Sequence, residues 1–466
     1  MASADTIVAM GTPPGVAALA VIRLSGPGSW DIVRGICPGL PESPEARRAM
    51  LARASDPDTG IPLDQVLVTM FPGPGSYTGE DMAEISCHGG WLSPALVVEA
   101  CLRGGARRAE EGEFTRRAFL NGKMDLIQVE AVLDLIESRS PALHGAAVHQ
   151  LERGLSRRIG ELREGLVDIE ALLVHHLDFP EEDEPPVPAA RILARAGEVM
   201  GMMEVLLQTA PEGELLREGA VTVLAGLPNS GKSSLFNALL GEERAIVTEV
   251  PGTTRDALEG VVSLGGFPFR LVDTAGLRDT HEKVERMGIE VARRYLRDAD
   301  VILFCVEGDR ALEAMESRFL QDVVGTPVVL VRTKADLFPE ASPGGSWPAA
   351  PELEGVGHRV EGVVVLSAET GLGLERLQAL LPELAFRGLV LAGVEIPLLT
   401  RRRHAAGIRV ALRELSAFRD GLATGLPAEV AATHLRPAET ALEELLGVIP
   451  REQILDRLFK DFCIGK

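Results

Sequence analysis

Cysteine is scarce in this sequence, and no two cysteines lie at metal-binding spacing. The 466 residues contain five cysteines, an odd number, and none belongs to a C-x-x-C pair. Zinc sites and disulfide frameworks need closely spaced or paired cysteines, so the sequence predicts neither of them. We therefore expect a protein of a reducing compartment, the cytoplasm.

Long apolar runs are also lacking. No uninterrupted apolar stretch approaches the roughly 18 residues that a membrane-spanning helix needs. The N-terminus reads Met-Ala-Ser-Ala-Asp, without a basic start followed by an apolar stretch, so we expect no secretory signal. The sequence therefore predicts no membrane partner.

Positive charge is in deficit. Lysine and arginine number 47 against 68 aspartates and glutamates, which gives a net charge of −21. This balance argues against a protein that coats nucleic acid through a general basic surface. It leaves open RNA binding through a local patch or through a partner protein.

What is present is the composition of a globular protein with several domains. A chain of 466 residues exceeds one hydrophobic core and predicts about three domains. The first ~120 residues mix short β-like apolar runs, such as 7–10 and 18–24, with Gly/Pro turns, which predicts a compact α+β domain.

A helical pattern begins near residue 123. Apolar residues recur at spacings of three and four in two groups: Val129, Val132, Leu133 and Ile136, then Leu151, Leu155, Ile159, Leu162, Leu166, Ile169 and Leu173. One apolar stripe on long helices favours a helix bundle over a coiled-coil filament. The acidic, proline-rich run at 179–188 breaks the helices and is expected to be a solvated loop.

Between about 218 and 386 the pattern becomes α/β. Short apolar runs at 221–225, 269–272, 301–306, 328–331 and 363–366 are mostly separated by helix-length segments. This alternation predicts a mainly parallel sheet covered on both faces. Helical periodicity returns after about 388. We therefore expect domains at 1–121, 122–217, 218–386 and 387–466, with the α/β domain inserted into a split helical domain.

The strongest motif is a phosphate-binding loop. The segment Gly226-Leu-Pro-Asn-Ser-Gly231-Lys232-Ser233 follows the apolar run 221–225 and has the pattern G-x-x-x-x-G-K-S. Glycines let backbone N–H groups surround phosphate oxygens, and the following helix presents its N-terminus to the anion. Lys232 is expected to reach the terminal phosphates and Ser233 to ligate Mg²⁺. The nucleotide-binding residues expected here are Asn229, Ser230, Gly231, Lys232, Ser233 and Ser234.

Four further segments follow in the order that a GTP site needs. Thr253 and Thr254 lie where a switch loop supplies a second Mg²⁺ hydroxyl, from Thr254. Asp273-Thr274-Ala275-Gly276 would hold Mg²⁺ through water and sense the γ-phosphate. Thr333-Lys334-Ala335-Asp336 offers a carboxylate to the N1–H and 2-amino group of guanine, and Ser367-Ala368 completes the base pocket. Each motif is weak alone, but four in order on strand ends indicate GTP.

The chain resembles the MnmE (TrmE) family of tRNA-modification GTPases, within the Era-like branch. The resemblance runs from end to end and rests on Asp5-Thr-Ile-Val-Ala, Val21-Ile-Arg-Leu-Ser-Gly-Pro27, Ser76-Tyr-Thr-Gly-Glu-Asp81, Cys87-His-Gly-Gly90, Gly112-Glu-Phe-Thr-Arg-Arg-Ala-Phe-Leu-Asn-Gly-Lys123 and the terminal Phe462-Cys-Ile-Gly-Lys466. The family usually has N-K-x-D in the base-reading loop. This chain has Thr333 in place of the Asn, which is expected to lower nucleotide affinity while base choice, through Asp336, survives.

The resemblance implies K⁺-activated GTP hydrolysis between two facing G domains. The K⁺ ligands would be Asn229, Thr248, Val250 and Thr253, within the loop Thr248-Glu249-Val250-Pro251-Gly252-Thr253. Glu285 would orient the attacking water, with Glu282 as the nearest alternative, and Lys232 would act on the phosphates. The plain alternative for Asn229 is a turn residue, and for Glu285 a solvated carboxylate.

The resemblance also implies a tetrahydrofolate site on the N-terminal domain. Arg23, Glu80 and Lys123 match folate-contacting positions, and Lys466 joins them from the C-terminus. Cys463 is either a thiol near the folate, with a role in catalysis, or a small buried residue. Residues 454–459 form an amphipathic segment that would anchor this tail.

Partners follow from the same resemblance. The family implies a homodimer formed through the N-terminal domain. The flavoprotein MnmG (GidA), which holds FAD, would be the other partner, and tRNA the substrate. The reaction implied is addition of a carboxymethylaminomethyl group at carbon 5 of the wobble uridine, with a formyl- or methylene-tetrahydrofolate as one-carbon source. A ribosome-assembly GTPase or a regulatory GTPase remains the alternative. The first would show a KH-type domain with G-x-x-G after the G domain, and the sequence contains none there.

Overall fold

The computed structural model describes residues 5–178, 187–242, 258–273, 295–308, 310–338, 360–392 and 397–449, and near the C-terminus residues 455, 458–460, 462, 464 and 465. The chain divides into two compact units. The first contains Met1–Leu133, Gln150–Ala196 and Arg413–Lys466, and the second contains Asp134–His149 and Gly197–Leu412.

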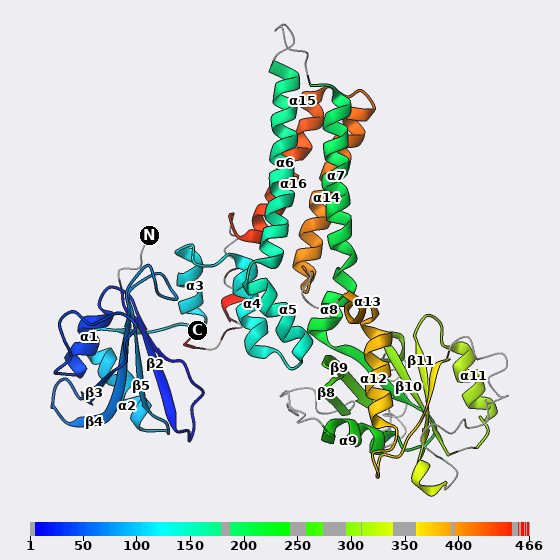
Figure 1. The fold of residues 1–466 in the computed structure, drawn as a ribbon, viewed down its shortest axis with the longest axis horizontal. Helices are drawn as coiled ribbons and strands as arrows, with labels where there is room; N and C mark the ends of the chain where they lie inside the picture. Colours follow the sequence, from blue (N-terminus) through cyan, green and yellow to red (C-terminus); the bar gives the residue numbers. More distant parts are fainter. Residues whose placement is uncertain are drawn as a thin grey trace, which may run out of the picture. The chain divides into compact units, whose positions relative to one another are not determined.

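The first unit contains a six-stranded sheet of order β3-β4-β5-β2-β1-β6, shown in Figure 1. Its strands are antiparallel except for the β1–β6 pair. Their bounds are β1 Ile7–Met10, β2 Leu19–Ser25, β3 Met50–Ser55, β4 Pro62–Phe71, β5 Met82–His88 and β6 Arg107–Arg108.

Alternation along these strands gives the sheet one buried face. In β2, Ala20, Ile22 and Leu24 are buried while the residues between them are more exposed. The helices α1 (Ser29–Ile36) and α2 (Ser93–Arg103) pack on the buried face and contribute apolar side chains to its core. The α+β prediction for this part of the chain is confirmed.

Helices from distant parts of the chain pack together in the same unit. Helix α6 (Gly154–Asp178) buries the predicted stripe from Leu155 to Leu173 and lies against α16 (Leu435–Leu446) (Figure 1). The Arg163 guanidinium bridges to Glu439 at 3.1 Å and to Glu443 at 2.9 Å. Segments before and after the α/β insertion therefore form one bundle, as the periodicity predicts.

The second unit contains another six-stranded sheet, of order β12-β11-β10-β7-β9-β8. All neighbouring pairs are parallel except β8–β9. The bounds are β7 Ala220–Ala225, β8 Leu258–Leu264, β9 Phe267–Asp273, β10 Val301–Glu307, β11 Val328–Thr333 and β12 Val360–Val365.

Both faces of this sheet are covered. On one face, side chains of α9 (Lys232–Glu242) and α12 (Leu374–Ala385) pack with Leu224, Leu303 and Val329. On the other face, Leu320 of α11 (Ala314–Asp322) packs with Val223 and Ile302. The prediction of a mainly parallel, doubly covered sheet is confirmed, while the edge strand β8 was not predicted.

The remaining helices are mostly short. Their bounds are α3 Glu113–Leu120, α4 Leu126–Glu137, α5 Pro141–Leu151, α7 Ala189–Gln208, α8 Ala210–Glu218, α13 Arg387–Ala392, α14 Arg402–Ala423 and α15 Ala428–Ala431, with 3₁₀ turns at Ala335–Leu337 and Ala432–His434. Among the residues described, no helix is both long and apolar enough to cross a bilayer.

Candidate functional site: a phosphate loop and a buried carboxylate network

Strand β7 lies where the order of the strands in the sheet reverses. Its two neighbours, β9 and β10, both follow it in sequence, and β10 and β11 lie on one side while β9 and β8 lie on the other. In open parallel sheets, ligands bind beside the carboxyl ends of the strands at such a reversal. The loop after β7 is therefore the expected ligand site of this unit.

The loop that follows β7 passes very close to the neighbouring strand β10. Gly226 has φ +141°, and a Cβ there would lie 2.3 Å from the carbonyl oxygen of Cys305. Only glycine fits this position. Helix α9 begins at Lys232, so its free N–H groups face the space that the loop encloses.

Polar groups with the chemistry of a phosphate and Mg²⁺ site meet in this loop. The Lys232 ammonium donates to the carbonyl of Leu227 at 2.8 Å, so its cation lies over the loop. The Ser233 hydroxyl donates to Oδ2 of Asp273 at 2.7 Å, at the end of β9. A hydroxyl and a carboxylate are hard oxygen donors, which suit Mg²⁺.

The ends of β11 and β12 hold the predicted base-reading residues together. The Thr333 hydroxyl donates to the carbonyl of Ser230 at 2.8 Å, which joins this loop to the phosphate loop. The Ser367 hydroxyl donates to Oδ1 of Asp336 at 2.5 Å, and Ala368 follows directly. Lys334 has φ +57°, and its ammonium pairs with Glu307 at 2.9 Å. The structure therefore brings the separate motifs to one edge of the sheet.

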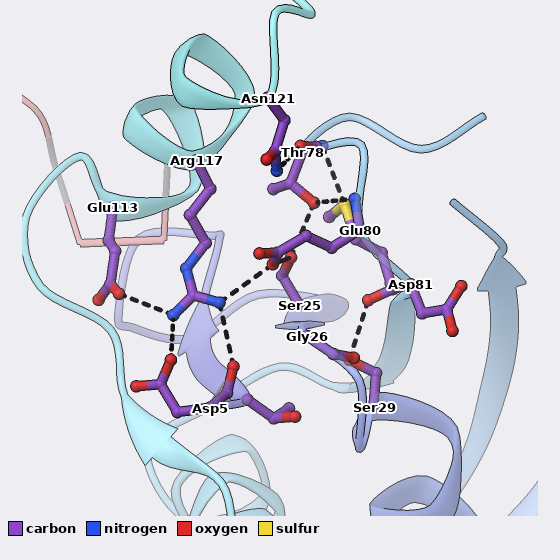
Figure 2. Close-up of polar contacts among 12 residues, drawn as sticks. Asp5, Ser25, Gly26, Ser29, Thr78, Glu80, Asp81, Glu113, Arg117 and Asn121 are labelled. Carbon is purple, nitrogen blue, oxygen red and sulfur yellow. Dashed lines mark hydrogen bonds and ion pairs between the residues drawn. The ribbon is translucent and has the colours of Figure 1, made fainter. Parts of the chain in front are cut away.

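A second polar cluster, which we call the Arg117 network, lies in the N-terminal part (Figure 2). The Arg117 guanidinium donates to Asp5 Oδ1 at 2.9 Å, Glu80 Oε2 at 3.0 Å and Glu113 Oε1 at 3.0 Å. The Ser25 hydroxyl also donates to Glu80 Oε2, at 2.7 Å. The Glu80 side chain is 8% exposed, so these donors satisfy carboxylate oxygens that are largely shielded from water.

Opposing effects act on the charges of this network. Burial raises the pKa of Glu113, but hydrogen bonds from Arg107, the Glu110 amide and Arg117 outweigh it and leave that pKa below its usual value. Burial lowers the pKa of Arg117, yet its bonds to Glu80 and Glu113 more than compensate and raise it. Both groups are therefore ionised at neutral pH.

Two other predicted ligand residues lie outside that network. Lys123 donates to the carbonyl of Pro74 at 2.8 Å and packs beside Gly79, the neighbour of Glu80. Arg23 pairs with Glu84 at 2.8 Å across β2 and β5 and lies next to Gly11. Lys123 is thus close to Glu80 in the fold, while Arg23 belongs to a separate ion pair.

The C-terminal tail reaches the same domain. Gly465 has φ +101°, and a Cβ there would lie 2.4 Å from the carbonyl oxygen of Met10. Ile464 forms an isolated bridge with Glu111. Of the predicted anchor, Leu455, Leu458 and Phe459 are buried against apolar residues of α4, together with Phe462, while Ile454 lies outside the described residues. Gly465 therefore lies against the backbone at the end of β1.

Several predicted site residues lie outside the described part of the chain. They are Thr248, Glu249, Val250, Pro251, Gly252, Thr253, Thr254, Thr274, Ala275, Gly276, Glu285, Cys463 and Lys466. The sequence interpretation also missed a central residue. Arg117 lies in the segment 112–123, but the sequence predicts no role for it because its partner Glu80 is 37 positions away.

These features define a P-loop nucleotide-binding protein, and comparison with known proteins identifies its family. The family model described as the MnmE helical domain matches residues 126–463, and that of the GTP-binding protein TrmE N-terminus matches residues 6–123. The tRNA modification GTPase MnmE of Moorella thermoacetica is 41% identical over 99% of both chains, and that of Geobacter metallireducens is 40% identical over the same shares. The chain belongs to the MnmE family.

Solved structures also match parts of the chain. The G domain of the T. maritima FeoB iron transporter is 28% identical, covers 36% of this chain and 98% of its own, and has a TM-score of 0.26. Era in complex with MgGDPNP and a segment of 16S ribosomal RNA is 25% identical, with coverages of 35% and 56% and a TM-score of 0.28. TM-scores this low support no conclusion about function.

Proposed function

We propose that this chain is a K⁺-activated GTPase that works with the flavoprotein MnmG, which holds FAD, on the wobble uridine of tRNA. As a member of the MnmE family it is a P-loop GTP hydrolase of tRNA modification. The observation that carries the proposal is the convergence of Lys232, Ser233, Asp273 and the Thr333–Asp336 loop at one sheet edge. The alternative of a ribosome-assembly GTPase finds no comparable support.

In this proposal the phosphate loop binds GTP with Mg²⁺. Lys232 and the N-terminus of α9 neutralise the phosphates, and Ser233 and Thr254 ligate Mg²⁺ with Asp273 acting through water. The contact between Ser233 and Asp273 supports the fit, because their oxygens already lie 2.7 Å apart. Bound Mg²⁺ would supply charge stabilisation at the β- and γ-phosphates.

K⁺ would supply the positive charge that an arginine provides in other GTPases. Its ligands would be Asn229, Thr248, Val250 and Thr253, and Glu285 would orient the attacking water. Asn229 is exposed and has φ +63°, an uncommon conformation for a residue other than glycine. Asparagine adopts this left-handed conformation more readily than most residues and does so in turns, so the role of Asn229 is proposed from the family resemblance.

The N-terminal domain would bind a formyl- or methylene-tetrahydrofolate. Arg23, Glu80, Lys123 and Lys466 are the proposed contacts, and Cys463 is the proposed thiol beside them. The approach of Gly465 to Met10 supports the inclusion of the tail, because Gly11 lies next to both Gly465 and Arg23. We propose that the domains span residues 1–121, 122–217, 218–386 and 387–466.

The same domain would form the homodimer. Leu51 and Leu67 are opposite each other in the β3–β4 pair, and they are 67% and 44% exposed. Strand β3 is an edge of the sheet. Adjacent apolar side chains on the open face of a sheet are typical of a protein interface.

The test is GTP hydrolysis by the purified chain in KCl and in NaCl at equal ionic strength. The proposal predicts a faster rate in KCl, and Glu285→Ala should lower kcat far more than GTP affinity. Glu282→Ala is the matched control and should keep most of the turnover. Equal rates in the two salts would remove the cation from the mechanism.

A further inference from the structure

The residue at the start of the base-reading loop, Thr333, is hydrogen-bonded within the protein. Its side chain is 3% exposed, and its hydroxyl donates to the carbonyl of Ser230 at 2.8 Å and, at a longer 3.4 Å, to that of Val306. A threonine hydroxyl carries a single proton. That proton is directed at two main-chain carbonyls and is not available to a ligand.

Two other polar side chains of these loops also have partners within the protein. The Ser367 hydroxyl donates to Asp336, and the Lys334 ammonium pairs with Glu307. Asp336 is an acceptor and matches the N1–H and 2-amino donors of guanine. Guanine also presents two acceptors, N7 and O6, on its major-groove edge. The Thr333 hydroxyl therefore has no proton left to donate to N7.

We infer that Thr333 braces the phosphate loop but does not read N7 of the purine, so that this chain binds 7-deazaguanine nucleotides as tightly as guanine nucleotides. The inference rests on the proposed function, with the base seated against Asp336. A residue at position 333 with an amide side chain would carry two protons, one for the brace and one for N7. Position 333 therefore determines whether the imidazole edge of the base is read.

Packing supports the bracing role. A Cβ at Gly231 would lie 3.1 Å from both Cβ and Oγ1 of Thr333, so this side chain fills the space beside the phosphate loop. Thr333 thus holds the phosphate loop by contact and by hydrogen bond. Its removal should weaken binding of every nucleotide by the same factor, whatever the base edge.

The experiment compares GDP and 7-deaza-GDP by isothermal titration, because diphosphates are not hydrolysed during the measurement. The full-length chain should bind both equally well. Thr333→Asn should prefer GDP by about three- to tenfold, the value of one added hydrogen bond. Thr333→Ser keeps the hydroxyl and should show no preference, and Thr333→Val should lose affinity equally for both.

Each protein is compared with itself across the two ligands, so a general loss of affinity does not obscure the ratio. A parent chain that prefers GDP over 7-deaza-GDP by threefold or more would overturn the inference, and loss of that preference in Thr333→Val would assign it to Thr333. A Thr333→Asn variant without any preference would also overturn it. Failure of the parent to bind either nucleotide would instead contradict the proposed GTPase function.

Discussion

At the scale of single residues, the clearest prediction about stability concerns the Arg117 network. Arg117→Met leaves the Glu80 carboxylate buried, with the Ser25 hydroxyl still donating to it. Removing one partner of a buried ion pair costs about 3–5 kcal/mol. We expect the free energy of unfolding of the N-terminal domain to fall by that amount. The measurement is urea unfolding of the full chain, monitored by a signal from this domain.

The matched control is an exposed ion pair in the same domain. Arg48 and Glu45 lie 2.6 Å apart, but each side chain is 69% exposed. Such pairs typically contribute less than about 1 kcal/mol. Arg48→Met should therefore have little effect, and equal losses in the two variants would contradict a special role for burial at Arg117.

The predicted nucleotide-site residues and the Arg117 network differ in how far the sequence could predict them. Lys232, Ser233, Asp273 and Asp336 follow apolar runs at fixed motif spacing, so their meeting at one sheet edge follows from parallel strand order. The contacts of Arg117 join residues 112 and 37 positions apart. No local pattern encodes such distances, and they arise only when the strands and α3 are assembled.

At the scale of elements, we propose that the modification reaction depends on where the C-terminal tail lies. Gly465→Ala would bring a Cβ to 2.4 Å from the Met10 carbonyl and should displace the tail from β1. We expect wobble-uridine modification in cells to fall sharply while GTP hydrolysis stays near normal. The control is Gly105→Ala, because Gly105 has φ +104° but nothing within 4 Å of its Cβ position.

Three outcomes of that comparison differ in meaning. Full modification by Gly465→Ala would show that the position of the tail is unimportant. Joint loss of GTPase activity and modification would indicate misfolding. Equal loss in both variants would assign the effect to backbone strain, because the two glycines share nearly the same φ.

The strands show where element prediction succeeds. The five predicted runs correspond to β7, β9, β10, β11 and β12, because buried parallel strands are almost continuously apolar. Strand β8 was missed. It is an antiparallel edge strand with alternating burial, and its signal was the Gly265-Gly266 turn that joins it to β9.

At the scale of the whole molecule, disruption of the proposed dimer should lower the molecular mass of the protein in solution. Leu67→Glu would bury a charge in the interface and should yield a monomer in analytical ultracentrifugation, with GTP affinity unchanged. Leu391 of α13 is 80% exposed and lies in the other unit, so Leu391→Glu is the control and should remain dimeric. A dimer that persists in Leu67→Glu would place the interface elsewhere.

The proposed function also requires that GTP hydrolysis by this chain serves tRNA modification. The direct measurement is nucleoside analysis of bulk tRNA from a strain that lacks the gene, complemented with the parent chain or with Lys232→Ala. The proposed function predicts that 5-carboxymethylaminomethyl-type uridines disappear in the deletion strain, return with the parent chain and stay absent with Lys232→Ala. Undiminished levels of these nucleosides in the deletion strain would contradict it.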